Sequence, residues 1–262
     1  MNQVNNILRV KNINRSFGGV KALKNFSLQI KKGNIYGIIG PNGAGKTTLF
    51  NIISGLLKSD SGKIYFKNER IDELSAEVRY KKGLARTFQK GSIVDNMTVL
   101  ENVMTGMYYY KNKSPLKSFF LKHLTINRRE KEMRERAEEV LEFVNLKGYS
   151  DRWSSDLVWV ERQLVQLARG LVSNPDLLLL DEPAAGMGSD ETNRIKNMIQ
   201  KINEKGITVI VISHNVELVM ELCDRISVIN FGQRISEGRP DDIKNDPEVL
   251  EAYIGEKARS IT

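Results

Sequence analysis

The chain has 262 residues, of which 40% are hydrophobic and 27% are charged, and its formal net charge at pH 7 is +8. This length fits one large domain, or one domain with a subdomain, and is sufficient for an enzyme with a substantial core. No stretch approaches the roughly 18 consecutive apolar residues that span a bilayer, so the composition excludes a chain that crosses a membrane by itself.

The positive charge favours an anionic partner such as a nucleotide, a nucleic acid or a membrane surface, and charge alone does not choose among them. Much of it lies in residues 111–136, where aromatic and leucine residues interrupt the basic ones. We interpret this stretch as a solvated helical face, with contact to anionic lipid headgroups as the alternative.

The first residues contain no basic region followed by a long apolar stretch. We therefore predict that the chain has no export signal and stays in the cytoplasm. The single cysteine, Cys223, lies in an apolar pattern and cannot form an internal disulfide, so we predict a buried structural thiol.

The first third of the chain is typical of short strands separated by glycine-containing turns. The expected strands cover residues 7–17, 25–30, 34–40 and 63–68. The pattern becomes helical over residues 98–146, and apolar residues at helical spacing predict a further amphipathic helix over 157–171.

The last third returns to strands that alternate with helices. Residues 177–181 and 208–213 are almost wholly apolar, as in parallel strands covered on both faces, and a helical segment over 190–206 separates them. A hairpin is expected over 225–240, with two short helices after it.

The stretch GPNGAGKT, from Gly40 to Thr47, fits the G-x-x-x-x-G-K-[ST] phosphate loop. Its glycines allow successive backbone N–H groups to point at phosphate oxygens, and the helix that follows offers its positive end. Lys46 supplies a point charge for the β- and γ-phosphates, and Thr47 can hold Mg²⁺. A glycine-rich turn with a surface lysine is the alternative, and it does not explain why the loop stands between an apolar strand and an amphipathic helix.

We therefore predict ATP and Mg²⁺ as cofactors of this chain. The nucleotide contacts are expected from Asn42, Gly43, Ala44, Gly45, Lys46, Thr47 and Thr48.

Two carboxylates, Asp181 and Glu182, end the apolar run LLLL. Asp181 can hold Mg²⁺ and its water, and Glu182 can orient and deprotonate the water that attacks the γ-phosphate. An Asp-Glu pair is also a common end to a strand, but its combination with a phosphate loop favours the catalytic interpretation.

These patterns predict an α/β fold with a P-loop NTPase core and a mostly parallel sheet, an N-terminal antiparallel β-subdomain and an inserted helical subdomain. We expect a single domain over residues 1–262, with the helical subdomain at about 95–173 and a C-terminal helical tail at about 235–262.

The motifs and their order resemble the ATP-binding subunit of an ABC transporter over nearly the whole chain. The resemblance implies that Phe17 stacks on adenine, that Gln89 touches Mg²⁺ and the attacking water, and that His214 contacts the γ-phosphate. Taken singly, Phe17 fits core packing, Gln89 fits a surface amide and His214 fits a strand cap. Their occurrence in the family's order favours the site.

Within that family the chain looks most like the ATP-binding subunits of branched-chain amino acid uptake systems. This resemblance rests on residues 86–107, on the basic helical insert that follows and on the terminal residues 237–256. Relatives carry other small molecules, so the resemblance does not name the solute.

In this family the helix after the insert usually begins with a Leu-Ser-Gly-Gly-Gln type signature, which binds the γ-phosphate of ATP held by the opposite subunit. The corresponding residues here are Leu157, Val158, Trp159, Val160 and Glu161. Val158 offers no hydroxyl, and we expect Val160 to place a β-branched side chain where the backbone should approach the ligand, with costly dihedrals. Backbone N–H groups at the helix start remain an alternative way to bind phosphate.

The family's two ATP sites each use the phosphate loop of one subunit and the signature of the other. Because Lys46, Asp181 and Glu182 are all present, the resemblance implies a chain that is intact as a donor of catalytic residues and poor as a donor of the signature. We predict a heterodimer with a different ATP-binding subunit, with a homodimer as the alternative. Many relatives also link the two sites through an aspartate, and the nearest residues here are Ala185, Gly186, Met187 and Gly188.

We predict a cytoplasmic ATPase subunit, peripheral on the inner face of the cell membrane, that powers uptake of branched-chain amino acids or similar small solutes. Its implied partners are transmembrane permease subunits, which would insert a short helix near Gln89, and an extracytoplasmic solute-binding protein, with no nucleic acid. The alternatives are an exporter subunit, a non-transport ABC ATPase acting on ribosomes or DNA, and a catalytically dead scaffold.

Overall fold

The computed structural model describes residues 6–87, 93–107 and 122–259, which form two sheets and the helices around them. The strands are β1 (Asn6–Phe17), β2 (Val20–Lys31), β3 (Ile35–Ile39), β4 (Ser61–Phe66), β5 (Glu69–Arg70), β6 (Leu84–Arg86), β7 (Leu177–Asp181), β8 (Thr208–Ile212), β9 (Arg225–Asn230) and β10 (Gln233–Gly238). The helices are α1 (Lys46–Ser54), α2 (Ala76–Lys81), α3 (Val99–Thr105), α4 (Lys122–Phe143), α5 (Trp159–Leu171), α6 (Ser189–Glu204), α7 (Val216–Leu222), α8 (Pro240–Lys244) and α9 (Pro247–Arg259), and a 3₁₀ turn, η2, covers Ser154–Asp156.

The larger sheet has the order β10-β9-β3-β8-β7-β6. Its strands β9, β3, β8, β7 and β6 pair in parallel, and β10 pairs antiparallel with β9 at the edge. Strands β3, β7 and β8 are buried along their whole length, which explains their almost continuous apolar sequences. The α/β class with a mostly parallel sheet is therefore confirmed.

The smaller sheet has the order β2-β1-β4-β5 and is antiparallel throughout. Its second strand begins at Val20, five residues before the expected start, because Gly18 and Gly19 both take positive φ and turn the chain directly into a hairpin. The register of that hairpin pairs Phe17 with Val20. This sheet is the expected N-terminal antiparallel β-subdomain.

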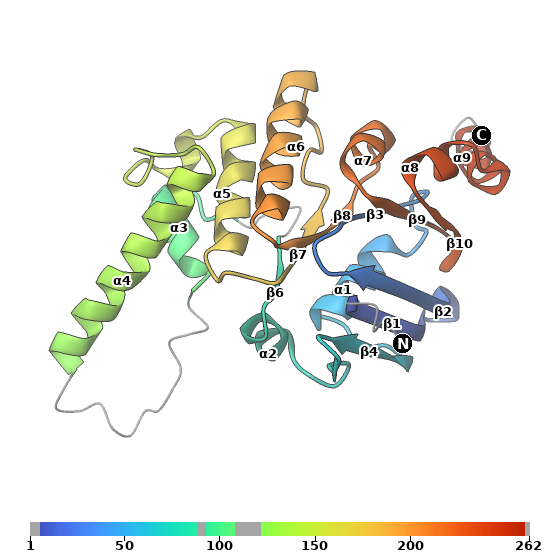
Figure 1. Cartoon of the computed structure of the whole chain (residues 1–262), viewed down its shortest axis with the longest axis horizontal. Coiled ribbons are helices and arrows are strands. Elements are labelled where there is room, and N and C mark those ends of the chain that lie inside the picture. The colour runs from blue at the N-terminus through green and yellow to red at the C-terminus, as the bar shows by residue number, and fades with distance from the viewer. Residues whose placement is uncertain (1–5, 88–92, 108–121, 260–262) are drawn as a thin grey trace.

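Strand β3 divides the hydrophobic core, because its side chains point alternately to opposite faces of the large sheet. Ile35 and Ile39 belong to the cluster formed with α3 to α7, whereas Tyr36 and Ile38 belong to the cluster formed with α1 and the small sheet. Figure 1 shows the small sheet and α1 on one side of the large sheet and α6 and α7 on the other.

The helices α3, α4 and α5 lie together at one end of the molecule, and α8 and α9 lie at the opposite end (Figure 1). The sequence pattern indicated helices in both regions, but it did not single out α2 or the short strand β6. The hairpin β9–β10 and the helices after it occur where they were expected. In the described part of the chain, no helix combines the length and the apolar character needed to cross a membrane.

Cys223 is buried, and its Sγ lies close to Gly37 of β3, where an added Cβ would come within 3.1 Å of it. Burial raises the pKa of the Cys223 thiol far above its usual range. The thiol is therefore a packing group at neutral pH, as the apolar pattern around it predicted.

A buried arginine, Arg79 of α2, joins the end of α1 to the turn before α2. Its guanidinium donates to the backbone oxygens of Ile52 at 2.6 Å, Ile53 at 2.8 Å, Asp72 at 3.0 Å and Leu74 at 3.0 Å. Burial lowers its pKa to about 10, which still leaves it protonated at neutral pH. The cation therefore supplies donors to carbonyls at the C-terminal end of α1, of which that of Ile52 also accepts the N–H of Gly55 at 3.2 Å.

We expect the substitution Arg79→Gln to lower the free energy of unfolding by about 3 kcal/mol, because a shorter side chain leaves buried carbonyls without donors. Urea unfolding followed by circular dichroism would measure the change. The matched control is Arg194→Gln on the exposed face of α6, which should shift stability by less than about 0.5 kcal/mol. Equal effects of the two substitutions would contradict this role of Arg79.

Candidate active site

The phosphate-loop sequence forms a tight turn between β3 and α1. Gly40, Gly43 and Gly45 take φ values of 153°, 75° and 109°. A Cβ at Gly40 would lie 2.0 Å from the backbone oxygen of Ile229, and one at Gly45 would lie 2.5 Å from that of Ala22. Glycine is therefore required at these two positions both by backbone conformation and by close packing against β9 and β2.

Helix α1 begins at Lys46 without a side-chain cap, since its N-cap residue is Gly45. The N–H groups of its first turn point out of the helix end and have no acceptor within the helix. The Lys46 ammonium is buried and donates to the backbone oxygens of Gly40 at 2.6 Å and Pro41 at 2.8 Å. The loop thus gathers positive charge and N–H donors at one point, which suits a phosphate group.

Asp181 ends β7, and Glu182 follows it in the left-handed region at φ 51°. This conformation is uncommon for a residue with a side chain and directs Glu182 away from the course of the strand. The Glu182 N–H donates to the backbone oxygen of Ile212 at 2.9 Å, which fixes the turn against β8. Oε2 of Glu182 accepts the backbone N–H of His214 at 3.2 Å and lies 2.9 Å from the Nδ1 atom of His214.

These groups share one cavity of about 420 Å³ at the carboxyl ends of β3, β7 and β8. Its lining consists of Ala22, Asn42, Gly43, Ala44, Gly45, Lys46, Thr47, Thr48, Asp181, Glu182, Ile212 and His214. The structure therefore brings the candidate residues of the phosphate loop together with Asp181, Glu182 and His214, although they come from three separate parts of the chain.

Phe17, at the end of β1, is not part of the lining of this cavity; the residue is 46% exposed, and its ring centre lies 4.7 Å from the guanidinium carbon of Arg15. Gln89 lies outside the residues that the structure describes. The expected adenine contact of Phe17 and the expected metal contact of Gln89 remain predictions.

Sequence reasoning missed one charged residue at the site, Arg86 at the end of β6. Its guanidinium forms an ion pair with Asp181, with Nη2 2.9 Å from Oδ2, and both side chains are about 95% buried. Burial raises the pKa of Asp181 and lowers the pKa of Arg86, and the hydrogen bond between them opposes both shifts. The available signal was an arginine three residues before Gln89 that closes a short apolar strand.

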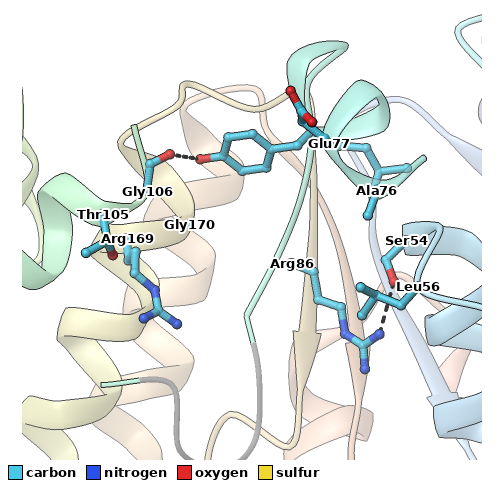
Figure 2. A pocket seen from close by; sticks show the side chains of 11 residues that line it. Ser54, Leu56, Ala76, Glu77, Arg86, Thr105, Gly106, Arg169 and Gly170 are labelled. Atoms are coloured by element: carbon cyan, nitrogen blue, oxygen red, sulfur yellow. Dashed lines mark hydrogen bonds between the residues drawn. The ribbon is translucent and has the colours of Figure 1, made fainter. Parts of the chain in front are cut away.

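Arg86 also lines a second cavity, of about 250 Å³, between α1, α2, α3 and α5. Figure 2 shows Arg86 beside Ser54 on one side of this cavity and Arg169 of α5 on the other. The hydroxyl of Tyr80 donates to the backbone oxygen of Gly106 across the top of it. The cavity therefore lies between the helical insert and the phosphate-loop helix.

The residues at the signature positions form the start of α5. Val158 is the N-cap residue, with φ −71° and ψ 163°, and Trp159 and Val160 lie in the first turn of the helix. Val158 and Trp159 are 58% and 45% exposed, whereas Val160 is buried. The expectation that Val160 would present its side chain to a ligand with costly dihedrals is wrong, because the helix turns that side chain into the core and its backbone is helical.

The side chains of Glu161 and Trp159 form hydrogen bonds between the start of α5 and neighbouring segments. The Glu161 carboxylate accepts the N–H of Val158 at 3.1 Å and the hydroxyl of Tyr149 at 2.9 Å. The Trp159 indole donates to the backbone oxygen of Ala185 at 3.0 Å, in the turn that follows Glu182. The start of α5 is thus connected within the chain to the segment that carries the catalytic candidates.

Comparison with known proteins shows similarity to ATP-binding proteins of ABC transporters. The family model described as ABC transporter matches residues 23–185, and one described as branched-chain amino acid ATP-binding cassette transporter matches residues 233–259. The probable branched-chain amino acid transport ATP-binding protein LivG of Methanocaldococcus jannaschii is 41% identical over 95% of this chain and 98% of its own. The high-affinity LivG protein of Salmonella typhimurium is 36% identical over the same shares.

A solved ATP-binding cassette of an ABC transporter in its ADP conformation has the same fold, with a TM-score of 0.84 and 39% identity over 95% of this chain and 99% of that one. Both the family match and the similarity of relatives over almost their full length include the phosphate loop and the Asp181–Glu182 pair. The chain therefore belongs to the ABC transporter family, as an ATP-binding subunit.

Proposed function

We propose that this chain hydrolyses ATP to power the uptake of branched-chain amino acids or similar small solutes through a membrane permease. The observation that carries the proposal is the 420 Å³ cavity, which combines the phosphate loop with Asp181, Glu182 and His214. The LivG relatives are named for branched-chain amino acid transport, which supports the choice of solute class. The identity to those proteins, 41% and 36%, is higher than the 33% to a lipopolysaccharide export ATP-binding protein of Haemophilus influenzae over a similar share of the chain, which favours uptake over the exporter alternative.

The donor set of the cavity fits Mg²⁺, because the Thr47 hydroxyl and the Asp181 carboxylate both line it and hard oxygen ligands are those that Mg²⁺ prefers. When bound, Mg²⁺ would neutralise charge on the β- and γ-phosphates. The loop amides and Lys46 would hold those phosphates, and Asp181 and Thr47 would provide the protein oxygens for the metal.

Glu182 would act as the base for the attacking water. Its carboxylate is 10% exposed and is held by the His214 N–H, so it has a defined direction and little competing solvent. His214 is 62% exposed, which leaves its ring accessible to a γ-phosphate in the cavity. Positioning and electrostatics would supply most of the catalysis, as in other phosphoryl transfers.

Two surfaces next to the helical insert, a cavity and the start of α5, are where we expect partner subunits to bind. The 250 Å³ cavity lined by Tyr80, Arg86 and Arg169 is the surface that would receive a short helix of a permease, which would place the chain on the inner face of the membrane. A solute-binding protein would belong to the same system. At the start of α5, the exposed Val158 and Trp159 offer a second subunit neither a hydroxyl nor a small residue.

This apolar signature supports pairing with a different ATP-binding subunit. In such a heterodimer, the site with Lys46 and Glu182 of this chain would meet an ordinary signature from the partner, and the other site would be weak. Val160 is buried and does not contribute to the asymmetry, which comes from the exposed Val158 and Trp159.

The substitution Glu182→Gln should leave ATP binding within about threefold of the wild-type value and reduce Mg²⁺-dependent turnover by at least about 100-fold, because an amide cannot accept the proton of water. Binding of a fluorescent ATP analogue and release of inorganic phosphate measure the two quantities. Glu204→Gln, an exposed position at the end of α6, is the matched control and should retain turnover. Turnover that survived in the Glu182 variant would exclude this residue as the base.

The heterodimer can be tested with a helper form of the same chain that carries Lys46→Ala, Val158→Ser and Trp159→Gly. The helper cannot hydrolyse ATP itself but offers a hydroxyl and a small residue at the signature, so mixing it with wild-type chain should raise turnover at least about tenfold over the wild-type chain alone.

The control for this experiment is a helper with Lys46→Ala only, which should give no increase. Phosphate release by each mixture, at a concentration where the chains associate with ATP, is the readout. Vigorous cooperative hydrolysis by the wild-type chain alone, or equal turnover with both helpers, would contradict the unequal heterodimer.

A further inference from the structure

The buried ion pair of Arg86 and Asp181 has no place in the chemistry described so far. Only 6% of the Arg86 side chain and 5% of the Asp181 side chain are exposed, and their charged atoms are 2.9 Å apart. The two residues are 95 positions apart in sequence, on the neighbouring strands β6 and β7. An ion pair this deeply buried loses the hydration of both charges, so each charge depends on the other for compensation.

Helix α1 fixes the position of the Arg86 guanidinium. Nη1 donates to Oδ1 of Asn51 at 2.7 Å and to Oγ of Ser54 at 3.1 Å, and the guanidinium carbon lies 5.5 Å from the centre of the Phe50 ring. Figure 2 shows the contact between Arg86 and Ser54. The guanidinium therefore connects the phosphate-loop helix with the strand that ends in Asp181.

This arrangement places a fixed positive charge against the carboxylate that the proposed function assigns to Mg²⁺. A cation that approaches Asp181 is repelled by Arg86 at short range and in a site with little water, where charge interactions are strong. In the absence of a metal, the same guanidinium supplies the opposite charge that a buried carboxylate needs. Arg86 and a metal ion are thus alternative counter-charges for one carboxylate.

We propose that Arg86 serves as the internal counter-cation of Asp181 and sets the Mg²⁺ concentration at which the chain binds Mg²⁺ with nucleotide. Asp181 alone is a weak metal ligand because Arg86 already neutralises it, and the phosphates of ATP supply the additional negative charge that makes binding favourable. The inference rests on the proposed function, which assigns the metal to Asp181.

The location of Arg86 also joins the two cavities. Its guanidinium is on the lining of the 250 Å³ cavity, while its partner Asp181 is on the lining of the 420 Å³ cavity. A segment seated in the smaller cavity would therefore touch the residue that controls the charge of the metal carboxylate.

The test is a titration of Mg²⁺ at pH 8 against a fixed concentration of a fluorescent ATP analogue, with the chain in the Glu182→Gln background so that the nucleotide is not consumed. We expect Arg86→Gln to lower the Mg²⁺ concentration at half-saturation at least about fivefold, because the competing charge is removed. Binding of Mn²⁺ alone, followed by electron paramagnetic resonance, should strengthen in the same variant.

Two variants separate this role from a structural one. Arg86→Lys keeps the charge, so its half-saturation should stay within about twofold of the unsubstituted value. Arg79→Gln removes another buried guanidinium, which donates to backbone carbonyls and not to a carboxylate, so it should lower stability without shifting the Mg²⁺ midpoint.

If Arg86→Gln does not fold, Arg86→Met replaces it, because the unbranched apolar side chain of methionine fills the buried space.

An unchanged or higher Mg²⁺ midpoint in Arg86→Gln would overturn the proposal, since it would leave Arg86 with a structural role or a role in presenting Asp181 to the metal. The failure of the proposed function would look different, because the chain with Arg86 intact would then not bind the ATP analogue at any Mg²⁺ concentration.

Discussion

The parallel order of β3, β8 and β7 is the constraint on which the candidate active site depends. Parallel strands end at the same edge of a sheet, so the phosphate loop after β3, the Asp181–Glu182 pair after β7 and His214 after β8 meet in one cavity. None of these segments could be moved to an edge position without separating the phosphate-binding groups from the carboxylates. The buried apolar runs of these strands, which look like ordinary core, are therefore also what assembles the site.

Two buried arginines, Arg79 and Arg86, have different roles near the phosphate-loop helix. Arg79 donates to backbone carbonyls and contacts the end of α1, whereas Arg86 lines the smaller cavity and pairs with Asp181, a carboxylate that lines the larger one. Both side chains are buried, and both contact α1, the helix that begins at Lys46. Two buried cations consequently anchor the C-terminal half of the phosphate-loop helix.

The start of α5 has a different character from the phosphate loop. Glycines and polar groups surround Lys46, but Val158 and Trp159 expose apolar surface, and Trp159 bonds to Ala185 in the turn after Glu182. This bond gives the chain a direct connection between the signature positions and the turn that follows Glu182. The phosphate loop and the start of α5 therefore present surfaces of opposite character, one polar and one apolar.

The sequence by itself determined the phosphate loop, the strand that ends in Asp181 and Glu182, the α/β class and the family, because each depends on local spacing or on motif order. The strand β6 and the ion pair of Arg86 with Asp181 were decided by the tertiary structure. Arg86 meets Asp181 only because β6 pairs with β7, 95 positions further along the chain. Such contacts join residues far apart in the chain, and no local pattern of residue types records them.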